Sequence, residues 1–361
     1  MQQNRVYIIA EAGVNHNGSL EIAKQLIEVA AGAGVDAVKF QTFKAENLVS
    51  KDAPKAAYQQ KMTNNQETQY EMLKKLELSE AFHDTLVKYC QQFGVQFLST
   101  PFDEDSLNLL VKKFNLPYIK IPSGEITNAP FLLKISKTGK SVILSTGMCT
   151  LGEVENSLKI MAFGYTNDNS NFPSLLDFEQ AYVSEQGQKA LREKVLLLHC
   201  TTEYPAPLSE VNLRTMDTLR HAFNLPVGYS DHTEGVAVPI AAVARGAVII
   251  EKHFTLNRDL PGPDHKASLE PEELKSMVHA IRQIEVALGN SVKLPTVSEV
   301  KNKQIARKSI VAMKEIKKGQ VFTEDNIGVK RPGDGISPMY YWELLGKVAD
   351  RDYSIEEKIV P

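Results

Sequence analysis

Short apolar runs alternate with amphipathic stretches along residues 6–288 of this 361-residue chain, and this alternation constrains the fold more than any other feature. The runs are rich in Val, Ile and Leu and nearly continuous in apolar character, which is typical of strands buried on both faces. The eight runs are Val6–Ala10, Ala37–Gln41, Val95–Thr100, Tyr118–Ile121, Ser141–Ser145, Val195–Cys200, Pro226–Ser230 and Ala247–Glu251. Eight strands that alternate with helices predict an α/β fold in which a parallel sheet closes into a (β/α)8 TIM barrel.

An open, doubly wound sheet is the alternative arrangement of such units. That fold class is marked by a glycine-rich dinucleotide fingerprint after the first strand. Here the segment after the first run, residues 13–18, carries two glycines at the wrong spacing for that fingerprint. The sequence therefore favours the closed barrel.

The pattern changes after the helix expected at residues 271–288. Residues 290–304 are mostly polar and are interpreted as a linker. Residues 305–361 contain short apolar runs joined by tight turns such as Lys317-Lys-Gly319, which predict a small, mostly β domain of about 55 residues, near the lower size limit for independent folding. The chain is thus expected to have a catalytic barrel at residues 1–289 and a second domain at 305–361.

Composition excludes several partners. The net charge is −3, which gives no electrostatic reason to expect binding to nucleic acid or to an anionic membrane. The first residues show no signal peptide, and no apolar stretch is long enough to cross a bilayer. The three scattered cysteines form no disulfide or metal pattern, which predicts a cytoplasmic protein, and Cys200 is interpreted as a packing residue.

Chemically reactive side chains occur where the runs end. In a (β/α)8 barrel the loops at the carboxyl ends of the strands build the active site. The side chains at or soon after these ends are Glu11, Lys39, Thr100, Lys120, Ser123, Ser145, Tyr204, Ser230, His232, His253 and Asp264. Lysines with several hydroxyls predict a surface that binds phosphate or carboxylate, and Glu11 can accept or direct a proton.

His232 and His253 follow the seventh and eighth runs. Adjacent parallel strands would bring both imidazoles to one rim, where they could bind one divalent metal and leave positions open for water or substrate. The alternative is that both are core or capping histidines. Lys39 could likewise form an internal ion pair with Glu11, which would not exclude a functional role.

These segments resemble, in order, the motifs of the sialic acid synthase family. The matching segments are residues 9–18, 38–42, 99–102, 120–125, 144–148, 229–233, 251–255 and 262–264. The tail, with Lys330-Arg-Pro-Gly-Asp-Gly-Ile-Ser337, is similar to the antifreeze-like (SAF) domain of these enzymes. The resemblance implies a transferase that condenses phosphoenolpyruvate with an N-acetylated mannosamine-type sugar. The product is a nine-carbon 2-keto acid, and phosphate is released.

The resemblance also implies a role for each residue. His232 and His253 would hold a divalent metal, typically manganese, that polarises the sugar aldehyde. Glu11 would orient or deprotonate the attacking water, or stabilise the cationic intermediate. The residues expected to bind phosphoenolpyruvate are Lys39, Thr100, Lys120, Ser123, Ser145 and Ser230, joined by Asn64 or Asn65. Tyr204 and Asp264 would contact the sugar, and Arg331 would reach its N-acetyl group in the barrel of a partner chain, in a domain-swapped homodimer.

Three segments, residues 124–128, 200–207 and 265–269, look most like the legionaminate branch of the family. That branch uses 2,4-diacetamido-2,4,6-trideoxymannose and makes N,N'-diacetyllegionaminate. The alternative is N-acetylneuraminate synthesis from N-acetylmannosamine, whose enzymes often carry an asparagine near Thr201 or Thr202. Two alternatives come from other functional classes. One is a metal-dependent aldolase that uses free pyruvate, and the other is a non-enzymatic carbohydrate- or ice-binding protein.

Overall fold

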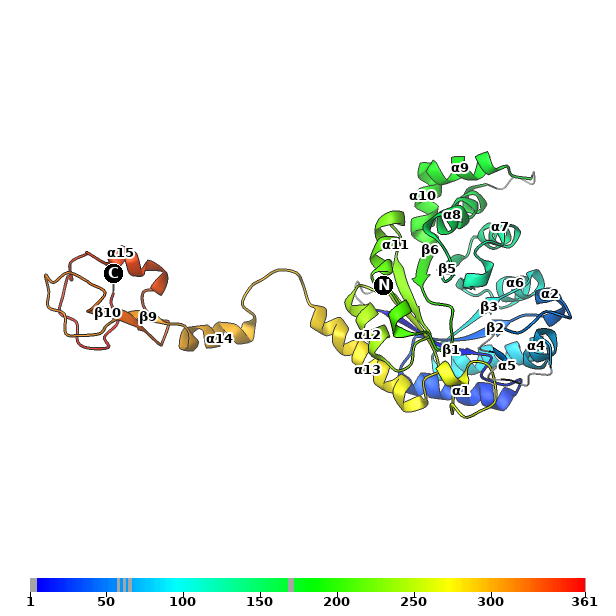
Figure 1. The fold of residues 1–361 in the computed structure, drawn as a ribbon, viewed down its shortest axis with the longest axis horizontal. Coiled ribbons are helices and arrows are strands. Elements are labelled where there is room, and N and C mark those ends of the chain that lie inside the picture. Colours follow the sequence, from blue (N-terminus) through cyan, green and yellow to red (C-terminus); the bar gives the residue numbers. More distant parts are fainter. Residues whose placement is uncertain (1–4, 57–58, 61–62, 64–66, 168–171, 361) are drawn as a thin grey trace. The chain divides into compact units, whose positions relative to one another are not determined.

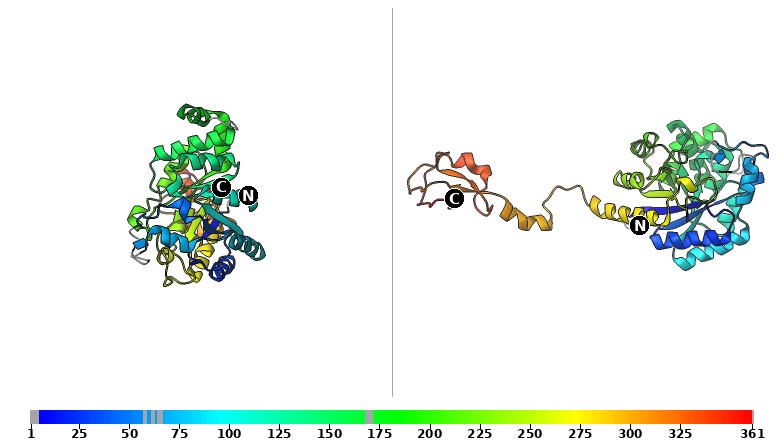
Figure 2. Two further views of the ribbon diagram at one scale, coloured as in Figure 1. Left: turned by 90° about the vertical axis from the view of Figure 1, so that its right-hand side faces the viewer. Right: turned by 60° about the horizontal axis from the view of Figure 1, so that its bottom comes forward.

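The computed structural model describes residues 5–56, 59–60, 63, 67–167 and 172–360 (Figure 1). It separates into two compact units, Met1–Gly289 and Asn290–Pro361, which are described in turn. In the first unit, strands gather at the centre and helices surround them, as the additional views in Figure 2 also show. None of the described helices is both long enough and apolar enough to span a membrane.

Eight strands form one parallel sheet whose order is β3-β2-β1-β8-β7-β6-β5-β4. The strands are β1 Tyr7–Gly13, β2 Ala37–Thr42, β3 Gln96–Pro101, β4 Tyr118–Ile121, β5 Ser141–Ser145, β6 Val195–His199, β7 Val227–Asp231 and β8 Ile249–His253. The terminal strands β3 and β4 also lie against each other, so the sheet closes on itself. The predicted barrel is therefore confirmed, and every strand overlaps one of the eight apolar runs.

Helices cover the outside of this sheet. They are α1 Leu20–Ala33, α2 Ala45–Leu48, α4 Gln69–Leu76, α5 Glu80–Phe93, α6 Glu104–Asn108, α7 Ala129–Lys137, α8 Leu151–Thr166, α9 Leu175–Val183, α10 Glu185–Lys194, α11 Thr215–Phe223, α12 Ala237–Ala244 and α13 Pro271–Leu288. Most begin at a side-chain cap, such as Ser19, whose hydroxyl accepts a hydrogen bond from the backbone N–H of Ile22 at 3.3 Å.

The last helix, α13, fastens the beginning of the barrel to its end. Arg282 donates to the carbonyl oxygen of Val6 at 2.9 Å and to Oδ2 of Asp36 at 2.9 Å. Glu285 accepts from the backbone N–H of Val6 at 2.6 Å. Residues far apart in the sequence thus close the barrel at its amino-terminal rim, opposite the strand exits.

The interior of the barrel has an apolar layer followed by a polar one. The apolar layer takes one residue from each of six strands: Ile9, Ala37, Leu98, Ile143, Leu198 and Ile249. Because side chains two positions apart on a strand point the same way, the residues two positions further on also face inward. They are Glu11, Lys39, Thr100, Ser145, Cys200 and Glu251, and all are buried. The strand register therefore places a mostly polar layer at the carboxyl end of the barrel.

The second unit contains α14 Val297–Ala306, an antiparallel pair of β9 Ser309–Ala312 and β10 Ile327–Lys330, and the short α15 Tyr341–Leu344. A small core that includes Ile310, Phe322 and Tyr353 holds it together. Helix α14 differs from the expected linker at 290–304. It begins with a capping box at Thr296 and Glu299 but buries none of its residues, so it lacks the apolar periodicity by which helices are recognised.

The pH dependence of stability should contain a clear contribution from His16. This side chain is buried, and burial lowers its pKa to about 4, whereas an unfolded histidine titrates near 6.5. Below pH 6.5 the unfolded state binds a proton that the folded state does not. The contribution of His16 to the free energy of unfolding is therefore fully present above pH 6.5. It decreases as the pH drops toward 4, by about 3 kcal/mol.

The variant His16→Asn tests this expectation, because its amide oxygen can replace the ring nitrogen that accepts from the backbone N–H of Gly18 at 2.9 Å. Urea unfolding at pH 7 and pH 4 should show that the stability gap between wild type and variant shifts by about 3 kcal/mol in favour of the variant at pH 4. A gap that is the same at both pH values would contradict a neutral, buried His16.

Candidate active site

The carboxyl end of the barrel brings together the side chains that the sequence singled out in residues 1–289. Those on strands are Glu11, Lys39, Thr100, Lys120, Ser145, Ser230 and His253, and those on the loops that follow are Ser123, Tyr204, His232 and Asp264. Arg331 lies in the second unit, where its side chain is exposed. Asn64 and Asn65 lie outside the described residues.

Lys39 lies at the centre of a buried polar cluster. Its Nζ is 2.5 Å from Oε2 of Glu11 and 3.6 Å from Oε2 of Glu251. It also donates to Oγ1 of Thr100 at 3.0 Å. The internal Lys39–Glu11 ion pair is therefore present, and it is one link of a network that spans four strands.

Lys120 extends this network across the barrel. Its Nζ donates to Oγ of Ser145 at 2.7 Å and lies 3.6 Å from Oε1 of Glu251. Ser230 donates to the same Glu251 oxygen at 2.8 Å. We refer to the residues Glu11, Lys39, Thr100, Lys120, Ser145, Ser230 and Glu251 as the polar ring. Two buried cations and three hydroxyls can bind an anionic ligand there.

Glu251 is the main site residue that sequence reasoning missed. It was interpreted as the end of the eighth strand, but β8 continues to His253. The available signal was the spacing of these two residues, because positions i and i+2 of a strand share one face. With His253 expected in the site, Glu251 had to face the same interior.

The two acidic groups of the polar ring differ in protonation. Burial raises the pKa of Glu11 to about 7, and the charge of Glu251 adds to this rise while Lys39 opposes it. Burial also works against ionisation of Glu251, but the charges of Lys120 and Lys39 outweigh it and hold the pKa of Glu251 at about 2. Glu251 is thus a fixed negative charge, and Glu11 can gain or lose a proton near neutral pH, as a general acid or base must.

His232 and His253 face each other beside this ring. Their ring centroids are 5.6 Å apart, and the Tyr204 ring lies 4.2 Å from His232 and 5.6 Å from His253. Nδ1 of His232 is 2.6 Å from the carbonyl oxygen of Thr201 and must donate to it, so the lone pair is on Nε2, which accepts from the hydroxyl of Tyr204 at 3.2 Å. Burial lowers the pKa of both histidines, so both are neutral at pH 7, the form that binds metals.

These two imidazoles fit a divalent metal. Nδ1 of His253 is buried without a hydrogen-bond partner and lies 4.0 Å from Oδ2 of Asp264, whose pKa burial raises to about 6. Within the described part of the chain, no group of three or more His, Cys, Asp or Glu side chains is arranged around a common metal position. The chain therefore offers two neutral nitrogen ligands, and water or substrate would have to complete the coordination.

A tight turn after β5 brings further polar groups together. Ser123 Oγ accepts from the backbone N–H of Gly147 at 2.9 Å and lies 3.2 Å from Sγ of Cys200. A Cβ at Gly147 would lie 2.4 Å from Oγ1 of Thr202, so only glycine fits. The Thr202 hydroxyl is buried without a hydrogen-bond partner, which makes it a further candidate for ligand contact. Burial raises the pKa of the Cys200 thiol, in agreement with a packing role.

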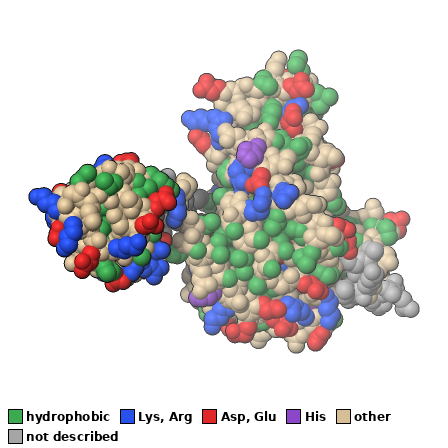
Figure 3. Space-filling model, turned by 60° about the vertical axis from the view of Figure 1, so that its left-hand side comes forward, with side chains coloured by type: hydrophobic (Ala, Val, Ile, Leu, Met, Phe, Trp, Pro, Cys, Tyr) green, Lys and Arg blue, Asp and Glu red, His purple; other side chains and the backbone are tan. Residues whose placement is uncertain are grey.

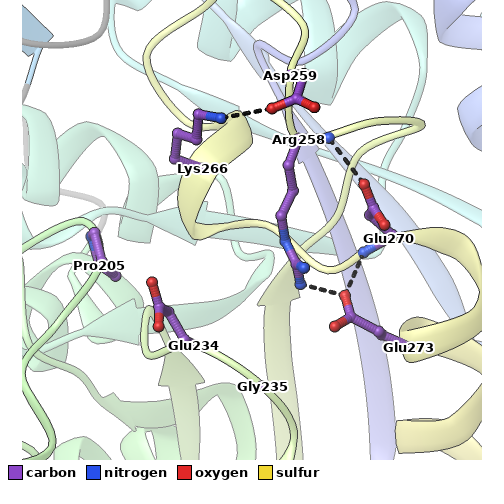
Figure 4. Close-up of a pocket in the computed structure, with 8 residues that line it drawn as sticks. All are labelled: Pro205, Glu234, Gly235, Arg258, Asp259, Lys266, Glu270 and Glu273. Carbon is purple, nitrogen blue, oxygen red and sulfur yellow. Dashed lines mark hydrogen bonds and ion pairs between the residues drawn. The ribbon is translucent and has the colours of Figure 1, made fainter.

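A cavity of about 720 Å³ lies among the loops that follow β6, β7 and β8 (Figure 4). It is lined by Pro205, Glu234, Gly235, Arg258, Asp259, Lys266, Glu270 and Glu273. Arg258 pairs with Glu273, and Lys266 lies 2.8 Å from Asp259. Because most of its charged groups are paired with one another, this cavity offers fewer groups for chemistry than the polar ring.

Comparison with known proteins gives consistent results. The sequence matches the NeuB family over residues 26–293 and the SAF domain over residues 307–354. N,N'-diacetyllegionaminic acid synthase from Campylobacter jejuni is 51% identical over 355 residues, which cover 98% of this chain and 99% of the relative. The Legionella pneumophila protein of the same name is 44% identical and covers 94% of this chain and 89% of the relative.

A solved structure shares the fold. The N-acetylneuraminic acid synthetase of Leptospira borgpetersenii, crystallised with citrate, superposes with a TM-score of 0.66 at 33% identity, over 83% of this chain and 90% of its own. Together with the barrel and the match over most of the sequence, these relationships show that the chain belongs to the NeuB family and carries a SAF domain.

Proposed function

We propose that the protein is a nonulosonic acid synthase that condenses phosphoenolpyruvate with 2,4-diacetamido-2,4,6-trideoxymannose to give N,N'-diacetyllegionaminate and phosphate. The observation that carries this proposal is the 51% identity, over 98% of the chain, to a relative named for that product. The polar ring and the facing histidines supply groups suited to both substrates. N-acetylneuraminate synthesis from N-acetylmannosamine is the second candidate, favoured by the structural likeness to the Leptospira synthetase.

The polar ring is the proposed site for phosphoenolpyruvate. Lys39 and Lys120 are both buried; burial is outweighed by the charges of Glu11 and Glu251, which raise the pKa of Lys39, whereas burial lowers the pKa of Lys120. With Glu11 protonated, the two ammonium groups outnumber the single negative charge of Glu251. An anion with carboxylate and phosphate groups would restore the balance and accept hydrogen bonds from the nearby hydroxyls. We assign these contacts to Lys39, Lys120, Thr100, Ser123, Ser145 and Ser230.

The histidine pair is the proposed site for a divalent metal, with manganese expected. When bound, such an ion would make the aldehyde of the open-chain sugar more electrophilic. His232 is held in place by the Thr201 carbonyl, and the Tyr204 ring packs against it. We assign Tyr204 and Asp264 to sugar contacts beside these imidazoles.

Glu11 is the proposed proton carrier. The enol carbon of phosphoenolpyruvate forms a bond to the aldehyde carbon, and the aldehyde oxygen takes the carbonyl electron pair and then the proton that water gives up in the next step; a cationic centre is left at the carbon that bears the phosphate. Water adds to that carbon, and the bond from carbon to the phosphate oxygen then breaks. A pKa near 7 allows Glu11 to orient the water and accept its proton, or as a carboxylate to stabilise the cation.

Phosphate release measured with each mannosamine derivative tests the proposal. The diacetamido sugar should give a kcat/KM at least about tenfold above that of N-acetylmannosamine, because small differences in ring substituents contribute on this scale. A higher kcat/KM with N-acetylmannosamine than with the diacetamido sugar would favour N-acetylneuraminate synthesis. Absence of phosphate release with every sugar would exclude the synthase, and product from free pyruvate would instead indicate an aldolase.

Arg331 is proposed to contact the sugar N-acetyl group from the SAF domain of a partner chain. Its exposed side chain is available for such a contact, and one face of the first unit carries a gathering of apolar side chains suited to association (Figure 3). We therefore propose a domain-swapped homodimer.

We also propose a cytoplasmic location, which the free Cys90, Cys149 and Cys200 support.

The variant Arg331→Ala should raise KM for the sugar about tenfold or more while KM for phosphoenolpyruvate changes less than about twofold, because a lost charged hydrogen bond contributes about 1.5–3 kcal/mol. Steady-state kinetics with each substrate varied in turn measures both constants. Arg351→Ala in the same domain, which removes a pair with Glu357, serves as the control and should change neither. Equal losses for both substrates would count against the N-acetyl contact.

A further inference from the structure

A fully buried ion pair joins the two strands that carry the histidines. Asp231 and Lys252 are register partners at the ends of β7 and β8, and neither side chain is exposed. Nζ of Lys252 lies 2.6 Å from Oδ2 of Asp231. Each residue directly precedes one histidine, so its side chain points to the face of the sheet opposite the polar ring.

Thr233 extends this pair to the other side of His232. Its backbone N–H and its hydroxyl donate to Oδ1 of Asp231 at 3.1 Å and 2.9 Å, and its carbonyl oxygen accepts from Lys252. The clamp contacts therefore hold the residues on both sides of His232 to Lys252, which is itself the residue before His253. We refer to Asp231, Thr233 and Lys252 as the clamp.

Stability alone is a weak explanation for such a pair. Moving two charges from water into the protein interior commonly costs more free energy than the ion pair recovers. Apolar residues of similar volume often stabilise a fold equally well or better. Here every hydrogen bond of the clamp ends on a residue adjacent to His232 or His253. The clamp thus joins the backbone segments that carry these two side chains.

We propose that the clamp is a positioning device that sets the spacing of His232 and His253 and thereby the affinity of the site for a divalent cation. This inference rests on the metal site proposed above. Outer contacts that orient metal ligands typically change metal affinity by about 10–100-fold when they are removed.

The test measures Mn²⁺ binding to the full-length protein by titration calorimetry, without substrate, alongside urea unfolding of the metal-free protein. Lys252→Met keeps the length of the side chain and removes its charge and its donors. The Kd for Mn²⁺ should weaken at least about tenfold. Thr233→Val removes one donor at nearly constant volume and should weaken binding less.

Two further variants keep the result interpretable. Asp231→Asn/Lys252→Met avoids leaving a buried carboxylate unpaired if the single variant does not fold, and its Kd should also weaken about tenfold. Leu158→Ala empties part of the core under α8, where Leu158 is fully buried, and should lower stability without changing the Kd.

The outcomes separate the clamp from the metal site. Weaker Mn²⁺ binding in the clamp variants, with unchanged binding in Leu158→Ala, supports the proposal. Wild-type Kd in all three clamp variants, with binding lost in His253→Ala, overturns the clamp and leaves the metal site intact. A wild-type protein that binds no Mn²⁺ overturns both the clamp and the metal assignment, although phosphate release would still test the synthase reaction.

Discussion

Replacing His253 with alanine is expected to abolish turnover while the barrel stays folded. The side chain lies at the end of β8, faces His232 across 5.6 Å between ring centroids, and carries a buried nitrogen without a hydrogen-bond partner. If the two imidazoles hold the metal that activates the aldehyde, losing one removes several kcal/mol of transition-state stabilisation, a decrease of about a thousandfold or more in kcat/KM. Because the removed group is an unpaired buried polar atom, the free energy of unfolding should change by less than about 2 kcal/mol.

Phosphate release at saturating Mn²⁺ and urea unfolding measure the two effects. His199→Ala is the matched control, because His199 is also buried on a barrel strand but bonds the carbonyl oxygen of Val211 at 2.8 Å, away from the polar ring. This control should lose stability and keep most of its turnover. A fully active His253→Ala protein would refute the metal assignment.

The barrel could be predicted because its strands are buried on both faces. Such strands appear in a sequence as compact apolar runs, and the structure has a strand at each of the eight runs. The ends of β1 and β8 extended further than expected, to Gly13 and His253. The reason is that the carboxyl end of the barrel interior is polar, so a strand continues into residues that resemble a loop in hydropathy.

The same physics explains what was missed in the site. Lys39, Lys120 and the two histidines stood out because charged or metal-binding groups followed apolar runs. Glu251 did not, since its partners Lys39 and Lys120 come from β2 and β4, and such pairings depend on the closed barrel. Thr202 is a common residue in a loop, and its distinguishing feature, a buried and unpaired hydroxyl, exists only after folding.

The network around Glu251 predicts the second large effect, which is that Glu251→Gln should lower both stability and kcat. This carboxylate lies 3.6 Å from Nζ of Lys39 and 3.6 Å from Nζ of Lys120. Removing its charge leaves two buried cations to share Glu11, and breaking buried pairs in this way typically costs about 3–5 kcal/mol. The same two cations would then favour the ionised form of Glu11 and lower its pKa below about 7. Glu11 would lose its match to neutral pH, so kcat should fall about a hundredfold or more.

Phosphoenolpyruvate should partly reverse this defect, which distinguishes a functional network from a purely structural one. The substrate anion brings the negative charge that the variant lacks, so it should raise the urea midpoint of Glu251→Gln more than that of wild type. Glu285→Gln is the matched control, since Glu285 is a half-buried carboxylate on α13 paired with Arg282 at 2.7 Å, at the opposite rim of the barrel. It should lose some stability, keep its kcat and gain no extra protection from substrate. If Glu251→Gln instead behaved like this control, the polar ring would be a device of barrel stability, and the anion site would have to lie elsewhere.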